Sequence, residues 1–105
     1  MSLTLQRLQE YLYEKYKTMK PDDLNNTQRY FLKLIEEVGE LSEAIRKDCR
    51  MKDDNIKGTI EEEISDVLYY IMVIANTYNI DVEKCFRLKE AYNAKKYGFK
   101  IEIDR

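Results

Sequence analysis

The chain has 105 residues, with 18 Lys and Arg, 20 Asp and Glu, and no His, so its formal net charge is −2. The absence of His excludes Ser-His-Asp and Cys-His nucleophilic sites, His-ligated zinc and haem held by a proximal His. With 44% apolar residues, three Gly and one Pro, the composition predicts one mainly helical domain over residues 1–105. Any metal ion would be held mostly by carboxylates, which favours Mg²⁺, Mn²⁺ or Ca²⁺.

Cysteine usage and hydropathy predict the compartment. Cys49 and Cys85 are far apart and form no Cys-x-x-Cys motif, so we expect reduced thiols and a cytoplasmic protein. No apolar run approaches the roughly 20 residues that a membrane span needs, and charged residues interrupt the N-terminal segment where a signal peptide would be apolar. We therefore expect no membrane partner.

Apolar spacing and end signals predict four helices, over about residues 4–17, 27–49, 59–78 and 82–97. Pro21 is expected to end the first helix, because the residue before a proline is pushed out of the helical region. Thr59 and Glu62 form a capping-box pattern at the start of the third helix. Asp81 is the expected cap of the fourth helix, and Gly98 is its expected terminator.

Each of the first three helices carries an apolar stripe with the spacing of a buried helical face. The stripes are Leu5, Leu8, Leu12 and Tyr16, then Phe31, Leu34, Ile35, Val38, Leu41 and Ile45, then Ile60, Ile64, Val67, Leu68, Ile71 and Ala75. We expect these residues to form the core. After the last helix, residues 99–103 alternate like a short strand or a docking arm.

An acidic pattern recurs beside the second and third stripes. A shift of 26 residues places Glu36, Glu37 and Glu40 on Glu62, Glu63 and Asp66. If the two helices pack as an antiparallel hairpin, both acidic sets converge beside the core. Two carboxylates about 4 Å apart repel by roughly 4 kcal/mol at an effective dielectric of 20, so such a cluster requires divalent cations or bound protons. Mg²⁺ fits best, because it also bridges carboxylates to phosphate oxygens.

Charge is segregated along the chain. Residues 36–66 carry five basic and eleven acidic side chains, whereas residues 84–105 carry seven basic and three acidic ones. Lys89, Asn93 and Lys96 share one face of the fourth helix and could hold a polyphosphate bound to the metal ions. By themselves, these three residues are more typical of a solvated helix face than of a ligand site.

The acidic pattern resembles the Glu-Glu-x-x-Glu … Glu-x-x-Asp signature of the MazG-type all-α nucleoside triphosphate pyrophosphohydrolases. The resembling segments are Glu36-Glu37-Val38-Gly39-Glu40 and, starting 23 residues after Glu40, Glu63-Ile64-Ser65-Asp66. Residues 31–35 and 41–44 around the first motif, and the later Lys89-x-x-x-Asn93-x-x-Lys96, are also similar to that family. The resemblance extends over nearly the whole chain.

The resemblance implies a bundle of four to five helices, completed by oligomerisation as a homodimer or a dimer of dimers. It implies Mg²⁺, with Mn²⁺ as the alternative, held by Glu37, Glu40, Glu63 and Asp66. Glu36 or Glu40 would accept the proton of the attacking water, and Lys89, Asn93 and Lys96 would contact phosphates. The family commonly has Arg where this chain has Lys96, which changes the geometry available for phosphate binding.

The implied reaction converts a nucleoside or deoxynucleoside triphosphate to the monophosphate and pyrophosphate, as in house-cleaning nucleotide hydrolases. No DNA or RNA polymer is an expected partner. Gln6, Gln9 and Tyr13 of the first helix, or a neighbouring subunit, would contact the base. Two alternatives remain: a helical interaction module whose acidic face binds a basic partner, and a catalytically idle relative that binds metal or nucleotide.

Overall fold

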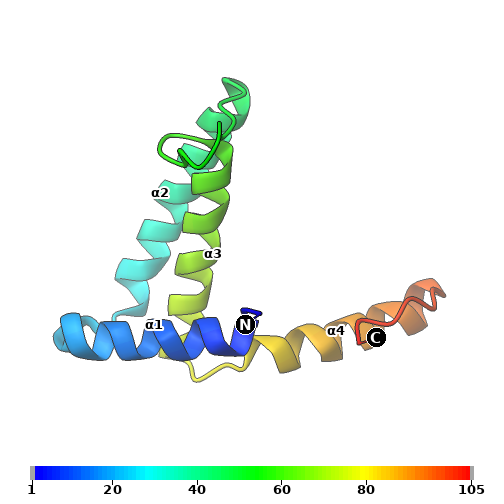
Figure 1. Ribbon diagram of the computed structural model, residues 1–105. Coiled ribbons are helices and arrows are strands. Elements are labelled where there is room, and N and C mark those ends of the chain that lie inside the picture. The colour runs from blue at the N-terminus through cyan, green and yellow to red at the C-terminus, as the bar shows by residue number, and fades with distance from the viewer. Residues whose placement is uncertain (1, 105) are drawn as a thin grey trace.

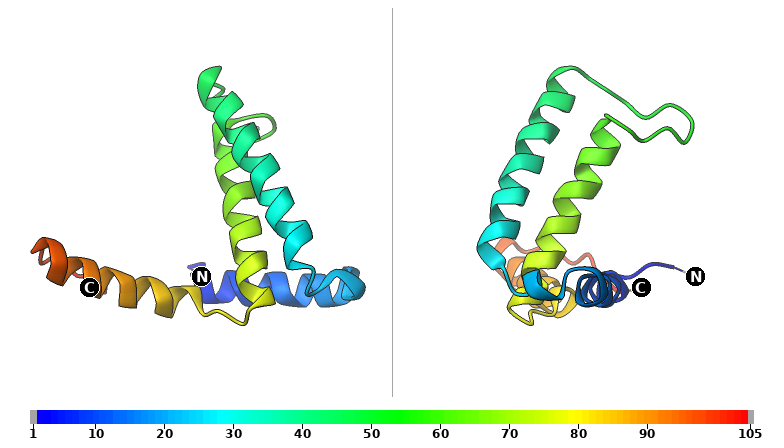
Figure 2. Two further views of the ribbon diagram at one scale, coloured as in Figure 1. Left: turned by 180° about the vertical axis from the view of Figure 1, so that it is seen from behind. Right: turned by 90° about the vertical axis from the view of Figure 1, so that its left-hand side faces the viewer.

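The computed structural model describes residues 2–104, and this part of the chain holds four α-helices, one short 3-10 helix and no β-strand. In chain order the helices are α1 (Leu5–Met19), η1 (Pro21–Asp23), α2 (Thr27–Arg46), α3 (Ile60–Thr77) and α4 (Val82–Tyr97). α2 and α3 lie side by side as an antiparallel hairpin, α1 crosses its base, and α4 leads away from it (Figure 1 and Figure 2). The predicted all-α class is confirmed. None of the described helices combines the length and apolar character that crossing a membrane requires.

A side-chain cap begins each of the described α-helices. Thr59 Oγ1 accepts a hydrogen bond from the N–H of Glu62 at 3.1 Å, and Asp81 caps α4 in the same way. Glu62 departs from the predicted capping box, because its carboxylate accepts a hydrogen bond from the N–H of Gly58 at 2.8 Å and not from Thr59. Gly98 ends α4 with a φ of +75°, a left-handed conformation that suits glycine.

The second helix is shorter than predicted. α2 ends at Arg46, before the expected end at Cys49. Asp48 has a φ of +52°, and the N–H of Cys49 turns back to the carbonyl of Ala44 at 3.0 Å. A residue in the left-handed region interrupts the helical hydrogen bonds, so the chain leaves the helix here and enters the loop that precedes α3.

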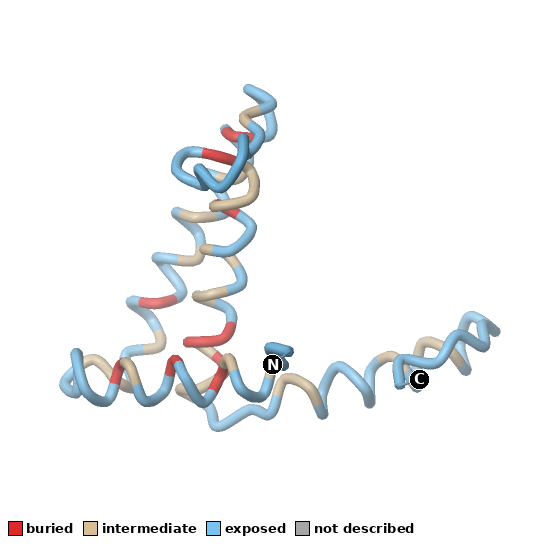
Figure 3. The backbone as a smooth tube through the Cα atoms, viewed as in Figure 1, coloured by how far each residue is buried: buried red, intermediate tan, exposed pale blue. Residues whose placement is uncertain are grey.

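The core lies mainly where α1 crosses the base of the hairpin (Figure 3). Leu12 and Tyr16 of α1 are buried there. They pack with Tyr30 of α2 and with Met72 and Val73 of α3. The rings of Tyr16 and Tyr30 meet edge to face with their centroids 5.3 Å apart, which is a favourable arrangement for two aromatic rings. The stripe predicted for the first helix therefore packs as expected.

Most of the stripes on the second and third helices are exposed, so the expectation that they form the core was wrong for a single chain. Val38 is 47% exposed and Ile64 is 55% exposed. Other exposed members are Phe31, Ile35, Ile45, Leu68 and Ile71. A helix in a two-helix hairpin can turn only one side towards its partner, and these residues lie about 100° away from that side. The radius of gyration, 16.1 Å, exceeds the roughly 13 Å of a compact chain of this length, so one chain does not close into a bundle.

α4 and the residues that follow it form a layer of their own. No residue of α4 is buried. Residues 99–104 run back along α4, and Arg87 Nη2 lies 2.8 Å from Asp104 Oδ1 (Figure 1). The short strand considered for residues 99–103 is not formed, and this tail lies as an arm against α4.

Candidate active site

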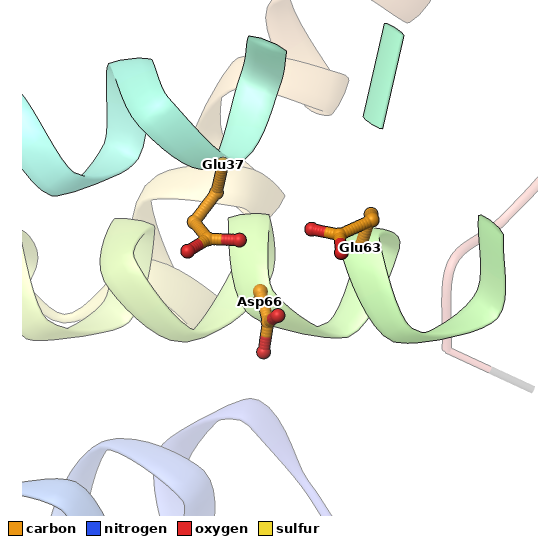
Figure 4. A group of neighbouring side chains, drawn as sticks. All are labelled: Glu37, Glu63 and Asp66. Carbon is orange, nitrogen blue, oxygen red and sulfur yellow. The ribbon is translucent and has the colours of Figure 1, made fainter. Parts of the chain in front are cut away.

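Three carboxylates from two helices converge in the middle of the hairpin. Glu37 of α2 and Glu63 and Asp66 of α3 each offer one oxygen atom, and these atoms lie within 4.8 Å of one another (Figure 4). Residues three apart on a helix share one face, which places Glu63 beside Asp66. Glu37 reaches the same place because its side of α2 faces α3. We call these three residues the carboxylate cluster.

Burial makes this cluster unstable without a counter-ion. Glu63 is only 8% exposed, and its Oε2 atom is buried with no hydrogen-bond partner among the described residues. Desolvation, followed by hydrogen bonding to Glu63 and the negative charges of Asp66 and Glu63, raises the pKa of Glu37 to about 7. A buried, unpaired carboxylate oxygen is costly, so the cluster has a strong tendency to take up a proton or a cation.

The charges around the carboxylate cluster favour a cation. Within residues 2–104, none of the three carboxylates forms an ion pair with a Lys or Arg side chain. Oxygen atoms from several carboxylates are the ligands that hard divalent cations prefer, and His or Cys ligands are absent from the cluster. The donor set therefore fits Mg²⁺ or Mn²⁺ better than a softer metal such as zinc.

The two other predicted acidic residues lie outside this cluster. Glu40 is exposed on α2, one helical turn beyond Glu37, and is not among the carboxylates whose oxygen atoms converge. Glu36 is also exposed, and its Oε2 lies 3.4 Å from Lys33 Nζ. Both residues stand close enough in sequence to approach a ligand on the cluster, and their roles as ligand and base stay predictions.

The predicted phosphate contacts on α4 are not brought to the cluster within one chain. α4 leads away from the hairpin, and it carries Lys89, Asn93 and Lys96 with it (Figure 2). The Lys89 ammonium lies 4.9 Å from the centroid of the Tyr92 ring, and that of Lys96 lies 5.3 Å from the Tyr97 ring. These residues therefore lie apart from the carboxylate cluster within one chain, and their role in phosphate binding stays a prediction.

Of the three residues of α1 that were expected to contact the base, Gln9 has a structural role, whereas Gln6 and Tyr13 are exposed. Gln9 is buried; its amide nitrogen donates to the carbonyl of Ile80 at 2.7 Å, and its amide oxygen accepts from the N–H of Val82 at 3.0 Å. Gln9 thus holds α1 against the turn between α3 and α4. Gln6 and Tyr13 line an open groove of about 440 Å³ beside this contact.

A second groove, between α1 and α3, contains residues to which the sequence analysis gave no chemical role. It has a volume of about 250 Å³ and is lined by Lys15, Tyr16, Met19, Lys20, Tyr69 and Tyr70. Burial, then the neighbouring Tyr69, raises the pKa of Tyr70; the positive charge of Lys33 opposes this rise, and the negative charges of Glu37 and Asp66 add to it. Tyr70 therefore lies within the field of the carboxylate cluster. The spacing of the two tyrosines from Asp66 could have shown from the sequence that they lie near the cluster. Nothing in the sequence connected Lys15 of α1 to them.

Comparisons with known proteins agree with the acidic pattern. A family model of the MazG nucleotide pyrophosphohydrolase domain matches residues 25–97. The crystal structure of Ctag-iMazG from Vibrio DAT 722 is 41% identical, covers 87% of this chain and 98% of that chain, and has a TM-score of 0.71. Ntag-iMazG from the same source is 40% identical, covers 92% of this chain and 100% of that chain, and has a TM-score of 0.73. No curated protein sequence matches the chain.

The region matched by the family model contains α2, α3 and α4, and with them the whole carboxylate cluster. The resemblance inferred from the acidic motifs is confirmed by sequence and by fold. The chain belongs to the MazG nucleotide pyrophosphohydrolase family and is a hydrolase that acts on nucleoside triphosphates.

Proposed function

We propose that the protein hydrolyses nucleoside or deoxynucleoside triphosphates to the monophosphate and pyrophosphate, with Mg²⁺ held by Glu37, Glu63 and Asp66. The observation that carries this proposal is the buried Glu63 oxygen atom, which has no hydrogen-bond partner in a cluster of three carboxylates. Family membership supports the type of reaction. Mn²⁺ is the alternative ion, because it accepts the same oxygen ligands.

Each acidic residue has a proposed role. Glu63 and Asp66 are held by the same helix and provide fixed anionic groups, and Glu37 closes the cluster from α2. A divalent cation bound there would offset the triphosphate charge and lower the pKa of an attacking water. Glu40, one turn from Glu37, would complete the ligand set or accept the proton of that water, and Glu36 is the second candidate base. The water oxygen bonds to the α-phosphorus, the α–β bridging bond breaks, and pyrophosphate leaves.

The roles of Glu36 and Glu40 can be separated by metal binding. If Glu40 is a ligand, Glu40→Gln weakens Mg²⁺ binding measured by calorimetry and lowers kcat. A residue that acts only as a base leaves Mg²⁺ binding unchanged, while kcat falls by about a hundredfold and its dependence on pH changes. Glu36→Gln is measured beside it, and a variant that changes neither quantity removes that residue from the site.

We also infer that two copies of the chain associate through one side of the hairpin. The apolar face, as we call it, consists of Phe31, Ile35, Val38 and Ile45 of α2 and Ile64, Leu68 and Ile71 of α3. On each helix, every one of these residues comes one position after a residue that faces the partner helix. Because the helices are antiparallel, that equal step rotates both stripes to the same side of the hairpin. An apolar surface of this extent is unusual for a monomer, which supports a homodimer or a dimer of dimers.

Charge supports the same association. α2 and α3 lie in the acidic part of the chain, whereas residues 84–105 of α4 and its tail are basic. An assembly that sets α4 of one copy near the hairpin of another would bring Lys89, Asn93 and Lys96 towards the carboxylate cluster. That arrangement would give the sequence prediction for these residues a structural basis.

The decisive experiment incubates the full chain with Mg²⁺ and a panel of ribo- and deoxynucleoside triphosphates, then separates pyrophosphate from phosphate. We expect equal amounts of monophosphate and pyrophosphate from at least one nucleotide. Release of single phosphate would show that another bond is cut. No turnover of any nucleotide would favour the catalytically idle alternative, and a melting temperature that millimolar Mg²⁺ leaves unchanged would favour the interaction module.

A further inference from the structure

The groove between α1 and α3 includes Tyr70, whose pKa, raised first by burial, also responds to the charges of Glu37 and Asp66. Tyr69 and Tyr70 follow Asp66 by three and four positions, so their side chains lie one helical turn from it. Lys15 comes from α1, which crosses α3 at this level, and Lys20 is the residue directly after α1. We call this feature the lysine–tyrosine groove.

This groove carries positive charge that no carboxylate of the described residues neutralises. Within residues 2–104, neither Lys15 nor Lys20 forms an ion pair. The Lys15 ammonium lies 5.0 Å from the centroid of the Tyr69 ring. Interaction with Tyr69 raises the pKa of Lys15 further above neutrality, where a lysine is protonated in any case. Tyrosine hydroxyls beside it add neutral hydrogen-bond donors.

The larger groove on the other part of α1 has the opposite character. Glu10, Glu14 and Asp81 line it, and three carboxylates repel a phosphate group. A triphosphate extending from the carboxylate cluster is therefore repelled from that groove and attracted towards the lysine–tyrosine groove. Lys33 of α2 also lies near the cluster, but it is already paired with Glu36 at 3.4 Å. Lys89 and Lys96 of α4 offer no competing site in the same chain, because α4 leads away (Figure 1).

We propose that the lysine–tyrosine groove receives the two terminal phosphates of the substrate, the part that leaves as pyrophosphate, with Lys15 as the principal contact and Lys20 as the outer one. This assignment rests on the proposed function. Negative charge builds up on pyrophosphate as the α–β bond breaks, and fixed ammonium groups stabilise that charge. A stacked base fits less well, because Lys15 already covers the Tyr69 ring and the Tyr69 and Tyr70 rings pack edge to face against each other.

The test measures the binding of pyrophosphate and of nucleoside monophosphate by calorimetry, each in the presence of Mg²⁺. Lys15→Gln is expected to weaken pyrophosphate binding by about tenfold to a hundredfold, the range for a hydrogen bond to a charged group, with monophosphate affinity unchanged. Lys15→Arg should restore most of the affinity, since it retains the charge. Lys17→Gln, an exposed lysine two positions along α1, is the matched control and should bind both ligands as the wild type does.

Two outcomes would overturn the assignment: Lys15→Gln binds pyrophosphate as tightly as the wild type, or it loses affinity for the monophosphate instead. Lys20→Gln provides a second variant at an exposed side chain, and a loss of about threefold is expected there. Calorimetry with Mg²⁺ alone should give the same affinity for all variants, because none of them belongs to the carboxylate cluster. If the wild type hydrolyses nucleotides and the Lys15 result is negative, only the groove assignment fails. If the wild type hydrolyses none, the proposed function fails, whatever the binding result.

Discussion

One side of the α2–α3 hairpin is apolar and the opposite side is acidic, although the residues responsible are only two positions apart in the sequence. Val38 follows Glu36, Ile64 follows Glu62 and Leu68 follows Asp66, in each case after one intervening residue. Two residues turn a helix by about 200°, which carries each apolar side chain to the side away from its acidic neighbour. The same two helices can therefore serve association with a second copy on one side and chemistry on the other.

The largest expected effect concerns the carboxylate cluster, in which Asp66 lies on the acidic side and Glu37 and Glu63 lie between the two helices. Glu63→Gln should lower kcat by about a hundredfold or more, since an essential anionic ligand becomes neutral. In the absence of metal the same variant should melt at a higher temperature than the wild type, because one repelling charge is gone. Glu43→Gln, which is exposed on the acidic side and pairs with Arg46 at 2.6 Å, is the control for turnover. Full activity of Glu63→Gln would remove the cluster from the active site.

The apolar side is tested by adding a charge to it. Ile71→Glu should shift the protein to the mass of a single chain in sedimentation or light scattering, because a buried unpaired carboxylate costs several kcal/mol at an interface. The dissociation constant of the assembly should rise by at least about tenfold. Ser65→Glu adds the same charge at an exposed position of α3 outside the apolar face. An unchanged mass for Ile71→Glu would mean that another surface holds the copies together.

The two sides also differ in their response to pH. Glu37 has its pKa raised to about 7 in the folded protein, so the folded state binds more protons than the unfolded state between about pH 4.5 and 7. The free energy of unfolding of the metal-free protein should therefore fall as the pH rises through this window, by at most about 3 kcal/mol. Saturating Mg²⁺ should reduce the fall, and Glu37→Gln should abolish most of it. A stability that is flat from pH 5 to pH 8 without metal would contradict the converging geometry.

The smallest effect is expected at the outer edge of α2, which belongs to neither side. Gly39 lies two positions from Glu37, and an added Cβ there would meet no heavy atom within 4 Å. Gly39→Ala should raise the free energy of unfolding by about 0.5–1 kcal/mol through its helix propensity, measured by urea denaturation. Turnover and solution mass should not change. A loss of either would indicate that a partner surface approaches α2 from this edge.

Much of the fold could be predicted because its determinants are local. Thr59 and Asp81 cap the starts of their helices, and Gly98 ends α4 in a left-handed conformation. Each of these caps depends on hydrogen bonds to residues only a few positions away. The error at the end of α2 arose from Asp48, whose left-handed conformation is not specified by its residue type alone. The acidic motifs were visible for a similar reason, since their spacing repeats along the chain.

The candidate site was predictable only in part. Glu37, Glu63 and Asp66 were expected to converge and do so, whereas Glu40 fits the same sequence pattern and lies outside the cluster. A three-residue step on one helix is fixed by helix geometry, but the reach from one helix to another depends on their register. Lys15 could not be connected to Tyr69 from sequence, because the crossing of α1 over α3 sets that contact.

The sequence by itself determined four helices, their caps, the two acidic motifs and the family, because these follow from short-range spacing and residue type. The tertiary structure alone decided which carboxylates share one site, which apolar residues stay exposed, and which lysines lie near the cluster. Those properties depend on how far each helix is rotated and displaced against its neighbour. Many residues along both helices together determine that rotation and displacement. A pattern along one chain fixes the faces of a helix, whereas packing fixes which face meets which.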